Sequence, residues 1–230
     1  MRFNPLGDRA IMITLGASID EATNQRVRAV SAALRAHPPA GAVDQVPAFA
    51  SVVVHYDPAR VSGDARVAPY DRMVKQLEAL LANASAPDVS EARLVEIPVC
   101  YGGAFGPDIE DVARRHELEP EDVIRIHTSG DYLVYMVGFM PGFAYLGGLS
   151  PRIATPRRPS PRTAVPAGTV GIGGDQTGVY PLVSPGGWNL IGKTPLRIFD
   201  IQRAEPTLLA AGDRVRFRQI SLSEFSDWPT

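Results

Sequence analysis

The chain has 230 residues, of which 45% are hydrophobic and 21% are charged, an ordinary composition for a globular protein that can bury one large core or two small ones. A formal net charge of −2 gives no reason to expect nucleic acid or an acidic membrane surface as a partner. No run of about eighteen apolar residues occurs, and residues 1–16 lack the apolar core of a signal peptide, so we expect a cytoplasmic protein without a membrane segment.

Residues that bind metals are few and scattered. The single cysteine, Cys100, excludes an internal disulfide and a thiolate zinc cluster, and its place at the end of an apolar run favours a buried thiol. Histidines occur at positions 37, 55, 116 and 127, without the spacing of metal ligands. We therefore expect no metal site and four histidines that are structural or exposed.

The first third of the chain alternates strand and helix patterns. Apolar runs predict strands at residues 10–15, 43–46 and 51–56. A capping box at 18–21 predicts a helix that continues through Leu34, and a second helix places Met73, Leu77 and Leu81 on one face. These elements predict a small α/β domain over residues 1–84, followed by a linker over 85–92, where the sequence is small, polar and aperiodic.

The remaining residues, 93–230, show a different pattern. A half-buried strand is predicted at residues 95–99, then two short helices, one capped by Asp108 and one beginning near Pro120. From residue 131 onward, short strands alternate with glycine and proline turns, ending in a strict period of two at 214–218. This pattern predicts a closed or nearly closed β-barrel, and the whole chain is expected to be of the α+β class.

Residues 138–195 hold the candidate site. Each glycine in this segment, taken alone, is more typical of a barrel turn, but the segment as a whole predicts a polar groove with aromatic walls. We expect the groove or interface aromatics to be Phe139, Phe143, Tyr145 and Trp188. Substrate or phosphate binding is assigned to Arg157, Arg158, Arg162, Gly173, Gly174, Thr177 and Gly187. Catalytic roles are assigned to Asp175 and Gln176, although Asp175 is equally interpreted as a turn residue.

Residues 187–194 read GWNLIGKT, which matches the written form of a phosphate-binding P-loop, G-x-x-x-x-G-K-T. A working P-loop follows a buried strand and opens a helix, whereas this segment is flanked by Ser-Pro-Gly and by a strand candidate at 195–200. Bulky residues also occupy the positions where a phosphate cradle needs space. We interpret the match as accidental.

Several longer motifs carry a family resemblance. Residues 161–170 (PRTAVPAGTV), 176–188 (QTGVYPLVSPGGW) and 138–146 (GFMPGFAYL) resemble the B subunit family of 5-oxoprolinases, also known as KipI-type sensor-kinase inhibitors and as allophanate hydrolase subunit 1. The N-terminal motifs at 7–10 (GDRA), 47–51 (PAFAS) and 55–58 (HYDP) are similar to the same family. The resemblance covers essentially the whole chain and implies that the barrel is cyclophilin-like.

The resemblance also implies a function. It implies the B-type component of an ATP-dependent enzyme that opens 5-oxoproline to L-glutamate together with A-type and C-type proteins. ATP is then a co-substrate, accompanied by Mg²⁺, and no cofactor is permanently bound. Two alternatives stay open: an inhibitor that binds a sensor histidine kinase, and a carboxyltransferase component of a biotin-dependent, urea carboxylase-like enzyme. Because no nucleophile, base or metal set can be assembled, we expect the chain to supply half of a site.

Overall fold

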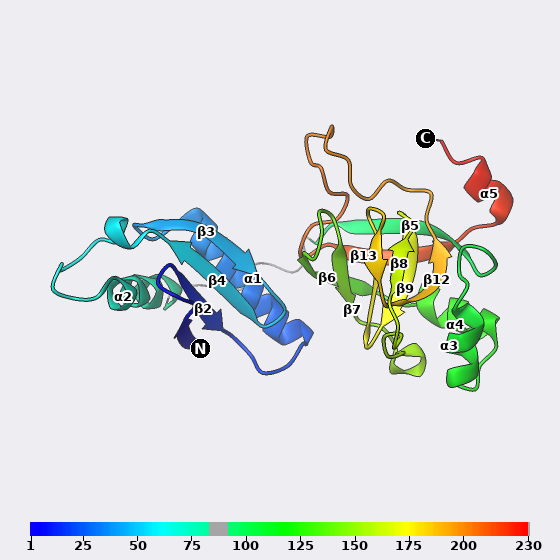
Figure 1. Cartoon of the computed structure of the whole chain (residues 1–230), viewed down its shortest axis with the longest axis horizontal. Helices are drawn as coiled ribbons and strands as arrows, with labels where there is room; N and C mark the ends of the chain where they lie inside the picture. Colours follow the sequence, from blue (N-terminus) through cyan, green and yellow to red (C-terminus); the bar gives the residue numbers. More distant parts are fainter. Residues whose placement is uncertain (83–91, 230) are drawn as a thin grey trace. The chain divides into compact units, whose positions relative to one another are not determined.

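A computed structural model describes residues 1–82 and 92–229. The chain divides into two compact units, Met1–Glu91 and Ala92–Thr230 (Figure 1). The predicted linker, 85–92, lies outside the described residues except for Ala92. Across the described ranges, none of the helices has the length and apolar character needed to span a bilayer.

The N-terminal unit is an antiparallel sheet packed against helices (Figure 1). Its strand order is β1-β2-β4-β3, with bounds Arg2–Pro5 (β1), Ala10–Thr14 (β2), Ala42–Pro47 (β3) and Ser51–Tyr56 (β4). The helical elements are α1 (Glu21–Ala36), the short η1 (Pro58–Arg60) and α2 (Pro69–Leu81). Ile11, Ile13 and Val54 alternate with less buried residues along β2 and β4, so one face of the sheet forms the core with the helices.

The start of α1 differs from the sequence prediction. The capping box predicted Ser18 as the N-cap, but the N-cap is Asp20, whose carboxylate accepts a hydrogen bond from the Thr23 amide at 2.7 Å. The Ser18 hydroxyl donates to the same carboxylate, and the helix begins at Glu21. Aspartate is as good an N-cap as serine, and its charge also interacts favourably with the helix dipole, so the prediction was wrong by two residues.

The second unit contains a closed seven-stranded barrel with the order β10-β7-β6-β13-β5-β12-β9, which confirms the expected α+β class with a barrel (Figure 1). The strands are β5 (Leu94–Tyr101), β6 (Tyr132–Val137), β7 (Ala144–Gly147), β9 (Thr169–Gly173), β10 (Gln176–Val179), β12 (Asn189–Lys193) and β13 (Arg214–Gln219). All neighbouring pairs are antiparallel except β5 and β13, which pair in parallel.

Shorter elements surround the barrel. They are α3 (Ile109–Arg115), α4 (Pro120–Thr128), η3 (Pro151–Ile153) and α5 (Leu222–Ser226). The strands β8 (Arg162–Val165) and β11 (Ser184–Gly186) pair as a separate two-stranded ribbon. Val112 of α3 and Val123 of α4 are fully buried in the barrel's apolar core. A second, smaller cluster outside the barrel interior contains Phe143, Val165, Tyr180, Trp188 and Leu190.

The barrel interior contains a series of hydrogen bonds that joins Tyr101, His127 and Thr177, which we call the interior chain. The Thr177 hydroxyl donates to the carbonyl oxygen of Gly171 at 3.0 Å, so it must accept from His127 Nε2, 2.9 Å away. The other ring nitrogen, Nδ1, then accepts from the Tyr101 hydroxyl at 2.7 Å. Burial lowers the pKa of His127 to about 3, which keeps the imidazole neutral, as this pattern requires.

Candidate functional site

The candidate site begins on the outer face of the β9–β10 hairpin. Successive residues of a strand point to opposite faces, so Thr177 faces the barrel interior while Gln176 and Gly178 face outward. A Cβ atom at Gly173 would lie 2.4 Å from Nε1 of Trp188, and one at Gly178 would lie 3.2 Å from Cζ3 of the same ring. The glycines therefore leave the space in which the Trp188 indole packs against these two strands.

Aromatic rings pack edge-on around this indole. Phe143, Tyr145 and Tyr180 have ring centroids 5.4, 6.1 and 6.5 Å from that of Trp188. Phe143 and Trp188 are only 2% and 4% exposed, so they form the interior of the cluster. Phe139 is 66% exposed, has a positive φ of 69° and contacts Phe143 edge-on at 5.7 Å. Of the four predicted groove aromatics, Phe139 and the half-buried Tyr145 offer surface to a ligand or partner.

Arg157 covers the outer side of this cluster. Its guanidinium carbon lies 6.0 Å from the Trp188 ring centroid, which is within the range of a cation–π contact. Burial raises the pKa of Tyr145, and the charge of Arg157 opposes that shift. The Tyr145 hydroxyl is therefore protonated at neutral pH. Within residues 1–82 and 92–229, no carboxylate forms an ion pair with Arg157 and no group accepts a hydrogen bond from its side chain.

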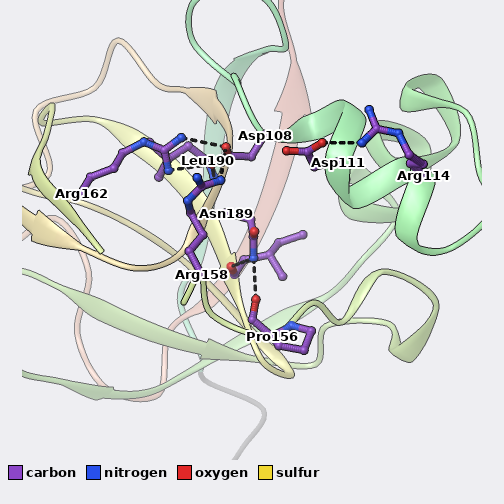
Figure 2. Close-up of polar contacts among 9 residues, drawn as sticks. Asp108, Asp111, Arg114, Pro156, Arg158, Arg162, Asn189 and Leu190 are labelled. Atoms are coloured by element: carbon purple, nitrogen blue, oxygen red, sulfur yellow. Dashed lines mark hydrogen bonds and ion pairs between the residues drawn. The ribbon is translucent and has the colours of Figure 1, made fainter. Parts of the chain in front are cut away.

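The other two predicted arginines bind an internal carboxylate, Asp108 (Figure 2). Arg158 donates to Oδ1 at 2.9 Å, and Arg162 donates to both carboxylate oxygens at 2.9 and 2.7 Å. The amide of Leu190 adds a fourth bond to Oδ2 at 2.7 Å. The Asp108 side chain is only 3% exposed, whereas those of Arg158 and Arg162 are 36% and 27% exposed. We call these three side chains the Asp108 cluster.

The Asp108 cluster fixes the 157–162 segment against the barrel. The Arg158 amide also donates to the Gly187 carbonyl oxygen at 2.7 Å. Asn189 donates to the Pro156 carbonyl oxygen at 2.9 Å (Figure 2). Two positive charges meet one negative charge here, so the cluster keeps a net positive charge. The binding of an external anion by Arg158 and Arg162 remains a prediction, and it would add to the bond with Asp108.

Sequence reasoning named Asp108 only as a helix cap. It does occupy the N-cap position of α3, but its side chain makes no capping hydrogen bond and accepts from the arginines instead. The partners lie 50 and 54 residues further along the chain. A local pattern cannot detect such a contact, and the available signal was only that three arginines had no acidic neighbour in sequence.

Gln176 occupies the most unusual position in the site. It is 7% exposed, and its Nε2 is buried without a hydrogen-bond partner in the described part of the chain. Gln176 lies directly opposite Gly173 in the hairpin register, so its side chain is beside Nε1 of Trp188. No described group accepts a hydrogen bond from that indole N–H either. We call Arg157, Gln176 and Trp188 the donor triad.

The remaining predicted residues flank the donor triad in sequence but add no unpaired side-chain donor to it. Asp175 is an exposed residue of the hairpin turn, and its catalytic assignment stays a prediction. Gly174 has a φ of 70°, and its amide already donates to the Thr155 carbonyl oxygen at 2.8 Å. Thr177 belongs to the interior chain. A Cβ at Gly187 would meet only ordinary contacts at 3.7–3.8 Å.

The P-loop match has the wrong local structure. Residues Asn189–Lys193 form strand β12 of the barrel, and no helix follows before β13. The helix N-terminus that would hold phosphates is therefore missing from this part of the described chain, which agrees with the accidental match expected above. The Lys193 ammonium lies 5.7 Å from the centroid of the Phe105 ring.

Known proteins resemble the chain over most of its length. A family model for the carboxyltransferase domain, subdomain C and D, matches residues 1–209. The B subunit of 5-oxoprolinase from Bacillus subtilis (strain 168) is 50% identical over 228 residues, which cover 96% of this chain and 93% of that protein. A putative urea carboxylase of Emericella nidulans is 26% identical over 141 residues, which cover 58% of this chain and 11% of that protein.

Solved structures also resemble the chain in both sequence and fold. The crystal structure of TTHA0988 superposes with a TM-score of 0.79 at 40% sequence identity, covering 93% of this chain. The chain spans 40% of the length of that protein.

Proposed function

This chain belongs to the carboxyltransferase subdomain C and D family that includes the 5-oxoprolinase B subunits, and on this premise we propose that it is the B-type component of an ATP-dependent 5-oxoprolinase. The complete enzyme would open 5-oxoproline to L-glutamate in the cytoplasm, with A-type and C-type proteins as partners. Identity of 50% across nearly the whole length of a relative that is named as a 5-oxoprolinase component supports this choice over the alternatives.

The donor triad is the observation that carries the proposal. Arg157 has no acid partner in the described chain, Gln176 Nε2 is buried there without an acceptor, and no described group accepts from the Trp188 indole N–H, which is not fully buried. A buried donor without an acceptor costs about 1–3 kcal/mol, and such groups are uncommon unless binding supplies the acceptor. The substrate 5-oxoproline carries a carboxylate and a lactam oxygen. Its carboxylate suits Arg157, and its lactam oxygen suits the two neutral donors.

The proposed chemistry begins at the lactam oxygen. Amide resonance makes the ring carbonyl a poor electrophile, so that oxygen first attacks the terminal phosphorus of ATP and ADP leaves. Water then adds to the ring carbon, the C–N bond breaks to open the ring, and a second water releases phosphate to give glutamate. Negative charge develops on oxygen during these steps, and preorganised N–H donors stabilise it. The Gly174 amide is already bonded, so Gln176 and Trp188 are the better candidates for this role.

The site on this chain would be one half of the complete active site. In the described ranges, no group of three or more His, Cys, Asp or Glu residues is arranged to hold a metal ion, so Mg²⁺ would arrive with the nucleotide. The buried histidine, His127, is bonded at both ring nitrogens inside the barrel and cannot reach the outer face as a base. A general base would therefore be Asp175, in the exposed hairpin turn, or a group of the C-type protein.

The test is reconstitution from purified components. Glutamate formation and 5-oxoproline-dependent ATP hydrolysis are measured with the chain alone, with its C-type neighbour, and with the A-type protein added. We expect activity only in the full mixture. An Arg157→Ala chain should assemble equally well but raise the KM for 5-oxoproline by about tenfold or more, with Arg60→Ala in the N-terminal unit as the matched control. Glutamate formation by the chain alone would contradict the half-site proposal.

A carboxyltransferase activity is the second candidate, because the family model and the putative urea carboxylase both match the chain. In that reaction the donor triad would hold a carboxyl group during transfer from biotin. The two candidates separate in one assay, in which carboxybiotin and urea replace ATP and 5-oxoproline. Carboxyl transfer to urea, without 5-oxoproline-dependent ATP hydrolysis, would favour this second function over the first.

A further inference from the structure

A second feature of the barrel unit is a pocket of about 620 Å³ whose lining contains no residue of the donor triad. Its volume is in the range of sites that hold ligands of nucleotide or drug size, and is far more than a five-membered lactam would fill. The walls come from the loop after β5, from the turn before β9, from the end of β12 and the segment after it, and from α5 and the residues that follow it. The lining residues used below are Phe105, Gly168, Lys193, Arg197, Phe225 and Trp228.

Lys193 supplies an unneutralised positive charge to this pocket. No carboxylate is among the lining residues, and no carboxylate in the described chain forms an ion pair with Lys193. Its stem lies along Gly168, where a Cβ would be 3.5 Å from Cε of the lysine, and its ammonium faces the Phe105 ring at 5.7 Å. The side chain is half-buried, so the lysine is held in position while its charge has no protein counterion.

The other walls are flat, apolar or positively charged. The rings of Phe105 and Phe225 pack at 4.5 Å between centroids, which closes one side of the pocket. Trp228, also half-buried, adds an indole that contacts neither of these rings. Arg197 bonds to Asp200 at 3.1 Å but is 70% exposed, so its other N–H groups are open to a ligand. The pocket therefore combines positive charge with a flat aromatic surface.

From this combination we infer that the Lys193 pocket binds a nucleoside phosphate, with Lys193 contacting the phosphates and Trp228 contacting the base. The inference goes beyond the proposed function, because it assigns to this chain a nucleotide-binding pocket that contains none of the donor triad. Bases of every kind stack on aromatic rings, and an ammonium binds phosphate as a point charge without P-loop geometry. The Lys193 pocket connects with the Asp108 cluster through β12, because Leu190 and Lys193 are three residues apart on that strand.

The lysine content of the chain allows a sharp test, because Lys75 and Lys193 are its only lysines. The purified chain is acetylated briefly with and without ATP, and the modification of each lysine is measured by mass spectrometry. We expect ATP to slow modification of Lys193 by about threefold or more, while Lys75, in the N-terminal unit, is unaffected and serves as the internal standard. Equal rates at Lys193 with and without millimolar ATP would overturn the inference.

Binding constants measured by calorimetry test each contact. Lys193→Gln should weaken ATP binding by about tenfold or more, Lys193→Arg should keep it within a few-fold, and Trp228→Ala should weaken it by about tenfold. Lys75→Gln is the matched control. If inorganic phosphate protects Lys193 as well as ATP does at equal concentration, the pocket takes an anion only and the nucleoside assignment is wrong. Protection by ATP in a chain whose reconstituted complex lacks 5-oxoprolinase activity would keep the pocket and reject the proposed function.

Discussion

The barrel interior and the outer face of the β9–β10 hairpin differ in whether their hydrogen-bond donors have acceptors. In the interior chain, every donor has an acceptor, and the direction of each bond follows from the Gly171 carbonyl oxygen at its end. Only a few residues away, the donor triad leaves its N–H groups without acceptors in the described chain. From this contrast we expect the hydrogen bonds of the interior chain to contribute to the stability of the fold, and the unpaired donors of the donor triad to contribute to binding.

The Asp108 cluster lies between these two extremes, since it is a buried ion pair with partly solvated arginines. Asp108→Asn removes the charge that faces Arg158 and Arg162, so we expect a loss of about 3 kcal/mol in the free energy of unfolding of the second unit. The loss is measured by urea unfolding followed by tryptophan fluorescence, because Trp188 and Trp228 are both in that unit.

Asp111→Asn is the matched control for that change. Its carboxylate pairs with Arg114 at 2.7 Å, but both side chains are more than half exposed (Figure 2). We expect less than about 1 kcal/mol for this surface pair. Equal effects of the two substitutions would mean that burial of Asp108 contributes nothing to stability.

The interior chain is tested by removing one hydroxyl. Thr177→Val keeps the shape of the side chain but leaves His127 Nε2–H without an acceptor, which should cost about 2 kcal/mol. Thr163→Val, at an exposed position of strand β8, should change the unfolding free energy by less than about 0.5 kcal/mol. An unchanged free energy of unfolding in Thr177→Val would mean that the hydrogen bonds of the barrel interior do not stabilise the fold, which contradicts the contrast with the outer face of the hairpin.

The pH dependence of stability gives a third test. His127 has a pKa of about 3 in the folded chain and about 6.5 when unfolded, so the unfolded state binds the extra proton first as the pH falls. Its contribution is fully present above pH 6.5 and is lost as the pH falls from 6.5 toward 3. We expect the unfolding free energy to fall by about 1.5 kcal/mol between pH 6.5 and 5, before most carboxylates titrate.

Two measurements check this expectation. The fall should persist in His55→Gln, because His55 is exposed in the N-terminal unit. A flat profile between pH 6.5 and 5 in the wild-type chain would mean that His127 is protonated in the folded state, which contradicts the bond directions of the interior chain.

The smallest effect on stability is expected at the donor triad. Gln176→Met replaces the unpaired amide with an apolar group of similar size, so the unfolding free energy should change by less than about 1 kcal/mol, in either direction. Turnover of the reconstituted enzyme should nevertheless fall by about a hundredfold, as for other oxyanion donors. A large loss of stability with normal turnover would mean that Gln176 has a structural role and does not act in the reaction.

Sequence patterns predicted the elements more successfully than the contacts between them. The period of two at 214–218 identified β13, because alternation within one strand is a local property. The N-terminal strand β1 was missed, since its four residues RFNP are not rich in β-branched or aromatic residues. The ion pairs of Asp108 span 50 residues or more, and no local pattern specifies them.

The sequence indicated which residue types belong to the candidate site, but not how their side chains contact one another. Phe143, Tyr145 and Arg157 contact Trp188, yet Phe143 is inside the cluster, and Arg158 and Arg162 are bound to Asp108. Which donors remain unpaired depends on the whole set of acceptors in three dimensions, so Gln176 could be named from sequence only as a polar residue of a glycine-rich loop. Lys193 illustrates the reverse case, since its motif was accidental but its side chain lines a pocket.

The parallel pairing of β5 with β13 determines when the barrel can close during synthesis on the ribosome. Strand β5, the first of the barrel, can pair with β13 only after β13, the last, has been synthesised. The separation is illustrated by Arg93 beside β5, which bonds to Asp213 beside β13, 120 residues later. At ordinary rates of translation this interval lasts roughly 6–24 s. During that time the edge of β5 that later pairs with β13 is unpaired. Its side chains Ile97, Val99 and Cys100, which are buried in the folded chain, are then exposed. We therefore expect a chain truncated before residue 214 to aggregate and not to form a smaller barrel.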